Sequence, residues 1–321
     1  MVNTAIDRAR LDAVATALGP RAQRNAPLGA RTTYRVGGDA AVLVEANDEG
    51  DLMAVHGALA TLDGAIPVLV LGEGSNLLVA DGGFPGLVIG LGPGFDWVEL
   101  GSSWVRAGAG AKLPVVARRS AAAGLHGLEW GVGLPGSVGG ALRMNAGGHG
   151  SDIATVLARC RVFDLDVGDG TDTGPEALAL GYRASSLGPR QVVVWAEFSL
   201  ERGDRVRAEQ TVADIVRWRR ENQPGGSNAG SVFVNPAGDS AGRLVEGAGL
   251  KGMRMGSAQV SPKHANFIQA DKGGSADDVW RLIEHVRVEV LRQTGIGLIP
   301  EVRMVGDPVP GPSTSTRGGE S

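Results

Sequence analysis

We predict an α+β fold for this chain of 321 residues. Short apolar or alternating segments, rich in valine and separated by Gly, Pro, Asp or Ser, are typical of strands. Helical segments lie among them, but without the regular alternation of strand and helix that a doubly wound sheet requires. The length is sufficient for two or three domains, each with its own core.

The first two thirds of the chain are expected to be rich in strands. They begin with a helix over residues 5–18, which Gly19 and Pro20 end. The expected strands are 41–46, 66–71, 86–91, 104–107, 155–165 and 191–200, and the expected helices among them are 49–61 and 112–123.

The sequence changes in character near residue 202, which indicates a further domain. Apolar residues recur at helical spacing between 207 and 222, opposite a face that carries arginines. Ser275 and Asp278 resemble a capping box, so a second helix is expected to begin there and to end at Gly295. Its apolar stripe consists of Val279, Ile283, Val286 and Val290. The last sixteen residues are rich in Pro, Gly, Ser and Thr, and we expect a disordered tail.

Composition argues against several classes of protein. The 31 Lys and Arg residues against 35 Asp and Glu residues give a net charge of −4, so we expect no general affinity for nucleic acid or for an anionic membrane. We find no apolar run long enough to span a bilayer and no hydrophobic core of a signal peptide. The expected location is the cytoplasm.

Cysteine and histidine usage argues against a metal site. Cys160 is the single cysteine, which excludes an intrachain disulfide and a cysteine cluster. It lies in an expected strand, so we interpret it as a buried, inert thiol. The five histidines show no paired spacing typical of metal ligands, and we predict no metal.

Two glycine-rich segments are the clearest functional signal. Residues 131–150, GVGLPGSVGGALRMNAGGHG, contain eight glycines, and residues 72–83 read GEGSNLLVADGG. Dense glycine allows backbone N–H groups to approach a phosphate, so both segments together indicate one large phosphate-bearing cofactor. Alternatively, both are tight loops between strands, because 51 of the 321 residues are glycine. The G-x-G-x-x-G match at 131–136 is weak evidence for a dinucleotide site, because Pro135 stands where a helix should begin.

Four further motifs occur in order along the chain: NAPLGARTTYRVGG (25–38), GYRASS (181–186), AGSVFVNP (229–236) and IPEVRMVG (299–306). Together with the glycine-rich segments, they resemble the UDP-N-acetylenolpyruvoylglucosamine reductase family from about residue 20 to residue 306. The resemblance implies a two-part FAD-binding domain of the vanillyl-alcohol-oxidase type plus a smaller α+β substrate domain. The implied boundaries are 1–89 and 90–201 for the FAD-binding subdomains, 202–305 for the substrate domain and 306–321 for the tail.

The implied activity is reduction of the enolpyruvyl ether of UDP-N-acetylglucosamine to UDP-N-acetylmuramate, a precursor of peptidoglycan. The resemblance also implies non-covalently bound FAD, with NADPH as the co-substrate. The implied FAD-binding residues are Tyr34, Arg35, Gly72, Gly74, Ser75, Asn76, Leu77, Pro135, Gly136, Ser137, Gly139, Gly140, Asn145 and Gly147. Tyr34 and Arg35 are equally compatible with a packing role.

The resemblance also implies three catalytic residues. Arg183 would grip the substrate carboxylate, because a guanidinium can bond to both oxygens. Ser231 would donate the proton to carbon, which requires neighbours that stabilise its alkoxide. Glu301 would share the developing charge, and burial would have to raise its pKa. Without the resemblance, these residues would read as a surface ion pair, a loop hydroxyl and a surface carboxylate.

Basic and amide side chains are candidates for the UDP end of the substrate. They are Arg219, Arg220, Gln223, Asn235, Lys263 and His264, and a solvated surface is the alternative reading for them. Two departures from the family stand out. Val234 replaces a basic residue that many relatives have, and the third domain contains no tyrosine, which is typical of the branch without a tyrosine-bearing loop over the substrate.

Two other functions are compatible with the glycine-rich segments. One is an FAD-dependent oxidase of an alcohol or a sugar lactone on the same fold. The other is a non-catalytic protein that binds a nucleotide sugar or a flavin. The motif AGSVFVNP and the set Arg183, Ser231 and Glu301 argue against the oxidase, and the absence of NADPH-dependent bleaching of a yellow protein would favour the non-catalytic alternative.

Overall fold

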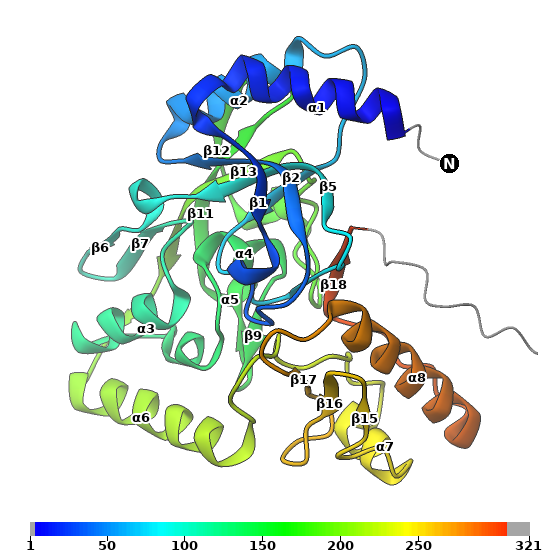
Figure 1. The fold of residues 1–321 in the computed structure, drawn as a ribbon. Coiled ribbons are helices and arrows are strands. Elements are labelled where there is room, and N and C mark those ends of the chain that lie inside the picture. Colours follow the sequence, from blue (N-terminus) through cyan, green and yellow to red (C-terminus); the bar gives the residue numbers. More distant parts are fainter. Residues whose placement is uncertain (1–3, 307–321) are drawn as a thin grey trace, which may run out of the picture.

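The computed structural model describes residues 4–306, so the predicted tail lies, apart from Gly306, outside the described residues. Mixed helices and strands form an α+β architecture, as predicted (Figure 1). Among residues 4–306, no helix is long and apolar enough to cross a membrane.

The first unit is a four-stranded sheet with two helices at its upper edge in Figure 1. Its strands are β1 (Ala22–Pro27), β2 (Asp39–Ala46), β5 (Phe84–Leu91) and β3 (Val68–Leu71), in that order across the sheet. β1 is antiparallel to β2, whereas β2, β5 and β3 are parallel. Helices α1 (Thr4–Leu18) and α2 (Glu49–Ala60) contribute to the buried cluster that includes β2 and β5.

The second unit is a five-stranded antiparallel sheet. Its strands are β12 (Asp169–Thr173), β11 (Leu157–Asp164), β13 (Gln191–Ser199), β7 (Trp104–Gly108) and β6 (Val98–Leu100). Helices α3 (Leu113–Ala122) and α4 (Val138–Arg143) and the 3₁₀ helix η4 (Glu129–Gly133) share its core. Cys160 lies fully buried in β11, as predicted, and burial raises the pKa of its thiol to about 11.

Two predicted strands begin too early. The strand expected over 66–71 starts only at Val68, as β3. Residues 155 and 156, expected to start the strand 155–165, belong instead to the short helix α5 (Ile153–Val156) that precedes β11. The cause is local, because the Asp152 side chain caps this helix by accepting a hydrogen bond from the Thr155 amide.

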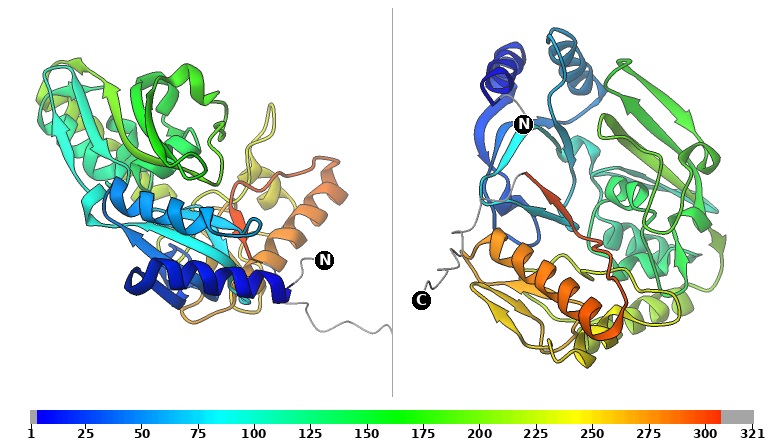
Figure 2. Two further views of the ribbon diagram at one scale, coloured as in Figure 1. Left: turned by 90° about the horizontal axis from the view of Figure 1, so that it is seen from above. Right: turned by 90° about the vertical axis from the view of Figure 1, so that its right-hand side faces the viewer.

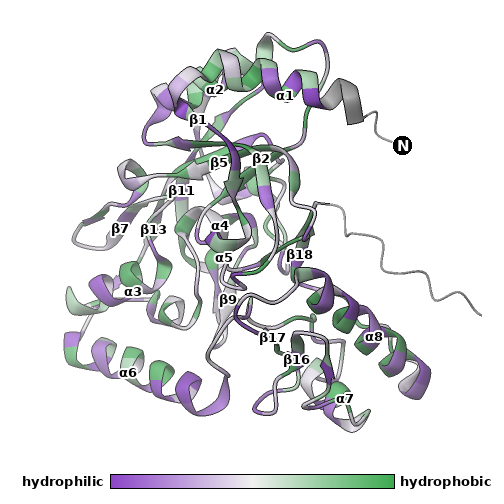
Figure 3. Ribbon diagram, in the orientation of Figure 1, coloured by the Kyte–Doolittle hydropathy of each residue, from purple (hydrophilic) through white to green (hydrophobic). Residues whose placement is uncertain are grey.

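The third unit is a small antiparallel sheet covered by a long helix. The strands β15 (Arg254–Met255), β16 (Ala258–Val260) and β17 (Ile268–Ala270) are joined by α7 (Ala241–Gly247) and α8 (Ala276–Thr294). Ser275 caps α8 by accepting a hydrogen bond from the Asp278 amide, and Gly295 ends it in the left-handed conformation. The four residues of the predicted stripe are buried in one cluster with residues of β16 and β17. Figure 3 shows that α8 carries both hydrophobic and hydrophilic residues along its length.

Two elements cross the boundaries that the sequence suggested. Helix α6 (Arg205–Asn222), assigned to the third domain, packs on α3 and η4 of the second unit, with Ile215 in the same buried cluster as Leu113. The apolar stripe of α6 therefore covers a core that ends before residue 202. Strand β18 (Arg303–Val305) pairs in parallel with β4 (Leu77–Val79), beside the first unit (Figure 2).

Short elements complete the chain. They are the strand pairs β8 (Leu125–His126) with β14 (Glu201–Arg202) and β9 (Gly147–Gly148) with β10 (Ser151–Asp152), and the 3₁₀ helices η1 (Gly19–Arg21), η2 (Gly29–Arg31), η3 (Pro93–Phe95) and η5 (Pro175–Leu178).

Candidate active site

The two glycine-rich segments meet in space. A Cβ added to Gly72, after β3, would lie 2.1 Å from Ser137 Oγ, and a Cβ added to Gly136 would lie 2.8 Å from Ser75 Oγ. Gly136 also has φ +138°, a conformation that L side chains rarely adopt. Glycine is therefore favoured at both positions where the two segments touch, and a single ligand can contact both segments.

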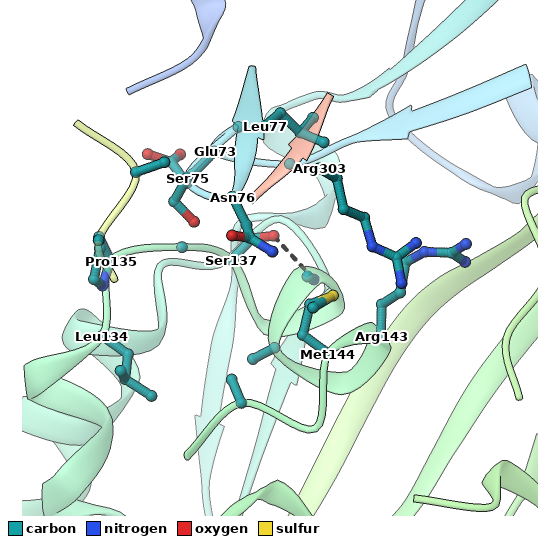
Figure 4. A pocket seen from close by; sticks show the side chains of 18 of the residues that line it. Glu73, Ser75, Asn76, Leu77, Leu134, Pro135, Ser137, Arg143, Met144 and Arg303 are labelled. Carbon is teal, nitrogen blue, oxygen red and sulfur yellow. Dashed lines mark hydrogen bonds between the residues drawn. The ribbon is translucent and has the colours of Figure 1, made fainter. Parts of the chain in front are cut away.

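A cavity of about 680 Å³ lies along this contact (Figure 4). It has the size of a small-molecule or cofactor site. The predicted residues that line it are Gly72, Gly74, Ser75, Asn76, Leu77, Pro135, Gly136, Ser137, Gly140, Gly147, Arg183, Arg219, Gln223, Ser231 and Glu301. Residues from all three units thus converge on one cavity.

The loop after β3 lines the cavity with residues 72–77. Within the described part of the chain, the amides of residues 73–76 donate no hydrogen bond to a protein acceptor. The carbonyls of Gly74 and Asn76, in contrast, accept hydrogen bonds from the Thr33 and Arg303 amides. Clustered amides without partners fit a diphosphate, because each N–H carries a partial positive charge.

Ser231 and Glu301 are brought together by backbone pairing between their motifs. The Glu301 amide donates to the Val232 carbonyl at 2.7 Å, and the Val234 amide donates to the Ile299 carbonyl at 2.9 Å. Phe233 and Pro300 form a β-bridge between these bonds. Ser231 directly precedes the paired segment, and both Ser231 and Glu301 line the cavity.

Arg183 completes the group. Its Nε lies 2.6 Å from Glu301 Oε1, and its Nη2 donates to the Gly147 carbonyl at 3.0 Å. Both side chains are largely buried, with 24% of Arg183 and 16% of Glu301 exposed. This is an ion pair inside the cavity and not on the surface.

The backbone of Arg183 is strained. Its φ of +54° is rare for a residue with a Cβ, and such a conformation costs about 1–3 kcal/mol. The turn is held by two hydrogen bonds between the backbones of Gly181 and Ala184, of 3.0 and 3.2 Å. The fold therefore holds a strained arginine at the tip of a tight turn, aimed at Glu301.

Burial raises the pKa of Glu301, and the nearby charge of Arg183 opposes this rise. The net direction is upward. A carboxyl with a raised pKa keeps its proton more readily and can donate a hydrogen bond. This is the direction that the proposed role of Glu301 requires.

Two family models match the chain. One is described as the FAD binding domain and covers residues 40–171; the other is described as the C-terminal domain of UDP-N-acetylenolpyruvoylglucosamine reductase and covers residues 222–305. The chain is 42% identical to the UDP-N-acetylenolpyruvoylglucosamine reductase of Rubrobacter xylanophilus, over 91% of this chain and 97% of that protein. The chain belongs to the UDP-N-acetylenolpyruvoylglucosamine reductase family.

Other members of this reductase family agree with the assignment. The reductase of Synechococcus sp. strain CC9311 is 44% identical, over 88% of this chain and 93% of its own length. The crystal structure of the reductase of Thermus caldophilus is similar with a TM-score of 0.77 and 36% identity, covering 89% of this chain and 99% of that one. FAD is the cofactor of this chain, and the free amides of residues 73–76 suit its diphosphate.

Four residues proposed from the reductase resemblance to bind FAD do not line the cavity. Tyr34 is fully buried with the core of the third unit, its hydroxyl finds no hydrogen-bond partner among the described residues, and burial raises its pKa. Arg35 is exposed. Gly139 donates its amide to the Ala109 carbonyl, and a Cβ there would lie 3.0 Å from the Ala109 Cβ.

Asn145 has a supporting role behind the cavity. Its buried side chain accepts a hydrogen bond from the Ala154 amide and donates to Asp152 and to the Gly181 carbonyl. Gly181 begins the turn that carries Arg183, so Asn145 connects the second glycine-rich segment to the pair of Arg183 and Glu301.

The residues suggested for the UDP end of the reductase substrate divide into two sets. Arg219 and Gln223 line the cavity, and Arg219 Nε donates to Gln223 Oε1 at 2.8 Å. The other four lie off the cavity wall. Lys263 Nζ donates to the Arg220 carbonyl, Asn235 Oδ1 accepts from the Ala241 amide, and the His264 ring packs edge-on against Phe267.

Sequence reasoning missed two arginines of the cavity. Arg143, at the end of α4, and Arg303, on β18, both line it, and Figure 4 shows their guanidinium groups next to each other. Burial and the charge of Arg303 lower the pKa of Arg143. Arg143 belongs to the glycine-rich segment 131–150 and Arg303 to the motif IPEVRMVG, but only the pairing of β18 with β4 brings the two arginines together.

Proposed function

We propose that this protein reduces UDP-N-acetylenolpyruvoylglucosamine to UDP-N-acetylmuramate for peptidoglycan synthesis, with NADPH as the reductant. The observation that carries the proposal is the convergence of Arg183, Ser231 and Glu301 beside the amide-lined loop, in one cavity. FAD, when bound, accepts hydride from NADPH and supplies it to the vinyl carbon of the substrate. A cytoplasmic location is part of this proposal, because NADPH and nucleotide sugars are made there.

Arg183 and Glu301 act together on the enolpyruvyl carboxylate. The Arg183 guanidinium offers further N–H donors besides those that bond to Glu301 and Gly147, and it attracts a carboxylate. Glu301, whose pKa is raised, shares a hydrogen bond with the same carboxylate. Negative charge that develops on the substrate is thereby placed against donors in a largely buried site, where their stabilising effect is greatest.

Ser231 delivers the proton to carbon. This role is supported by the position of Ser231, which lines the same cavity as Arg183 and Glu301 and directly precedes the segment whose backbone pairs with that of Glu301. The positive charge of Arg183 stabilises the alkoxide that remains on Ser231. An isolated serine would have no such stabilisation. The roles of Arg219 and Gln223 in holding the diphosphate of the substrate are part of the same proposal.

The substitution Ser231→Ala tests the proposal. We expect FAD reduction by NADPH to continue at the wild-type rate, and reoxidation of the reduced enzyme by the UDP-sugar to be largely abolished. Stopped-flow absorbance of the flavin measures both half-reactions. Normal reoxidation in the variant would remove Ser231 from the mechanism, and wild-type enzyme that oxygen but not the UDP-sugar reoxidises would overturn the proposed substrate.

A further inference from the structure

Asn266 forms hydrogen bonds with one edge of the segment 232–234, which follows Ser231. The Phe233 amide donates to Asn266 Oδ1 at 2.9 Å, and Asn266 Nδ2 donates to the Phe233 carbonyl at 2.9 Å. The Val232 amide donates to the Asn266 backbone carbonyl at 2.8 Å. One asparagine therefore makes three hydrogen bonds to two adjacent residues.

The opposite edge of the same segment pairs with the residues around Glu301. The bonds from the Glu301 amide to Val232 and from the Val234 amide to Ile299 lie there. The segment after Ser231 is thus bonded on both sides, like the central strand of a three-stranded sheet, although one side is provided by a side chain. Fixing both edges leaves little freedom for Ser231 to move relative to Glu301.

The chemistry of Asn266 suits this task. The side chain is only 3% exposed, and it needs a donor and an acceptor at once to satisfy both the amide and the carbonyl of Phe233. A carboxylate provides no donor, and an apolar side chain provides neither group. Asn266 is itself held in place, because its backbone amide donates a hydrogen bond to His264 Nδ1 at 3.2 Å.

We propose that Asn266 is a positioning residue for proton transfer, holding the Ser231 hydroxyl in register with Glu301. The proposal rests on the proposed function and deepens it. A displacement of about 1 Å in a reacting group can lower a rate on the order of 10²-fold, so loosening one edge of the segment affects the step that uses Ser231. Flavin reduction by NADPH does not use that hydroxyl.

The test compares both half-reactions of the FAD-bound enzyme carrying Asn266→Asp, a substitution of nearly equal shape that turns the Nδ2 donor into an acceptor. We expect NADPH to reduce the flavin within about twofold of the wild-type rate and reoxidation by the UDP-sugar to slow on the order of 10²-fold. We also expect a larger solvent deuterium isotope effect on reoxidation, because proton transfer becomes limiting. Asn266→Ala, which removes both side-chain bonds and introduces no charge, is measured in parallel.

Leu244→Ala is the matched control. Leu244 is buried in the core of the third unit that also contains Phe233, but it lies on α7 and makes no hydrogen bond to the segment. We expect it to lower the melting temperature at least as much as the Asn266 variants while both half-reactions keep their wild-type rates. A purely structural role for Asn266 predicts that both half-reactions fall together, or that Leu244→Ala shows the same selective loss.

The outcomes separate this inference from the proposed function. Wild-type enzyme that the UDP-sugar does not reoxidise contradicts the proposed function. If the wild-type enzyme carries out both half-reactions and the Asn266 variants that fold are reoxidised at the normal rate, only the positioning role is contradicted. Failure of both variants to fold, when Leu244→Ala folds, also overturns it, since Asn266 is then a determinant of folding.

Discussion

Alanine at Gly136 tests the contact between the two glycine-rich segments. The backbone there has φ +138°, and holding an alanine in such a conformation costs about 1–3 kcal/mol of stability. The new methyl group would lie 2.8 Å from Ser75 Oγ, so the Ser75 side chain must rotate away. That rotation costs little by itself, because Oγ is the end of a flexible side chain, but it moves a hydroxyl that lines the cavity.

We therefore expect two effects of Gly136→Ala. The melting temperature should fall by about 2–4 °C per kcal/mol, as in domains of about 150–250 residues. FAD affinity of the apoprotein, measured by quenching of flavin fluorescence, should fall at least about tenfold, which corresponds to about 1.4 kcal/mol.

Gly150→Ala is the control for backbone strain. Gly150 has φ +86°, no atom lies within 4 Å of an added Cβ, and it does not line the cavity. This variant should lose stability and keep its affinity for FAD. Equal FAD affinities of the two alanine variants would refute the reasoning that the two segments hold the cofactor at their contact.

Three further predictions concern the pH response, the packing of α6 and the charge of the cavity. The pKa of Glu301 is raised above its ordinary value of 4.5, so protonated Glu301 stabilises the folded protein, and this stabilisation is lost as the pH rises through the raised pKa. Glu301→Gln cannot titrate, so its free energy of unfolding minus that of the wild type, both from urea titrations, should increase over that pH range. A difference that stays constant with pH would contradict this prediction. Ile215→Ala should cost about 2–5 kcal/mol, because Ile215 joins α6 to the second unit, whereas Val206→Ala on the exposed face of α6 should change little in the same denaturant assay. Arg303→Gln should weaken FAD binding about tenfold and reduce the dependence of FAD binding on salt concentration. The reason is that the Arg303 guanidinium lines the cavity beside Arg143 and, among the described residues, forms no ion pair. An unchanged salt dependence would argue against an anion bound beside Arg303.

Much of the local structure could be predicted because its causes lie within a few residues. The Ser275 cap and the left-handed Gly295 delimit α8, and valine-rich runs became β2, β5 and β13. The glycine-rich segments and the four motifs likewise indicated a phosphate-bearing cofactor and the reductase family. Each of these signals depends on the order of neighbouring side chains and requires no knowledge of distant ones.

The arrangement of the site depends on contacts that no local pattern contains. Arg183 and Glu301 are 118 positions apart, and Asn266 reaches Phe233 across 33. The sequence did not reveal that Tyr34 joins the core of the third unit or that α6 covers the second.

By itself the sequence determined the five longest of the described helices, the strands β2, β3, β5, β7, β11 and β13, the glycine-rich segments and the candidate reactive groups, because these follow from backbone preferences and side-chain chemistry. The tertiary structure alone decided which groups share the cavity and which support it from behind. The physical reason is that a contact between distant residues forms only when the burial and hydrogen bonding of whole elements outweigh the entropy of closing the chain between them.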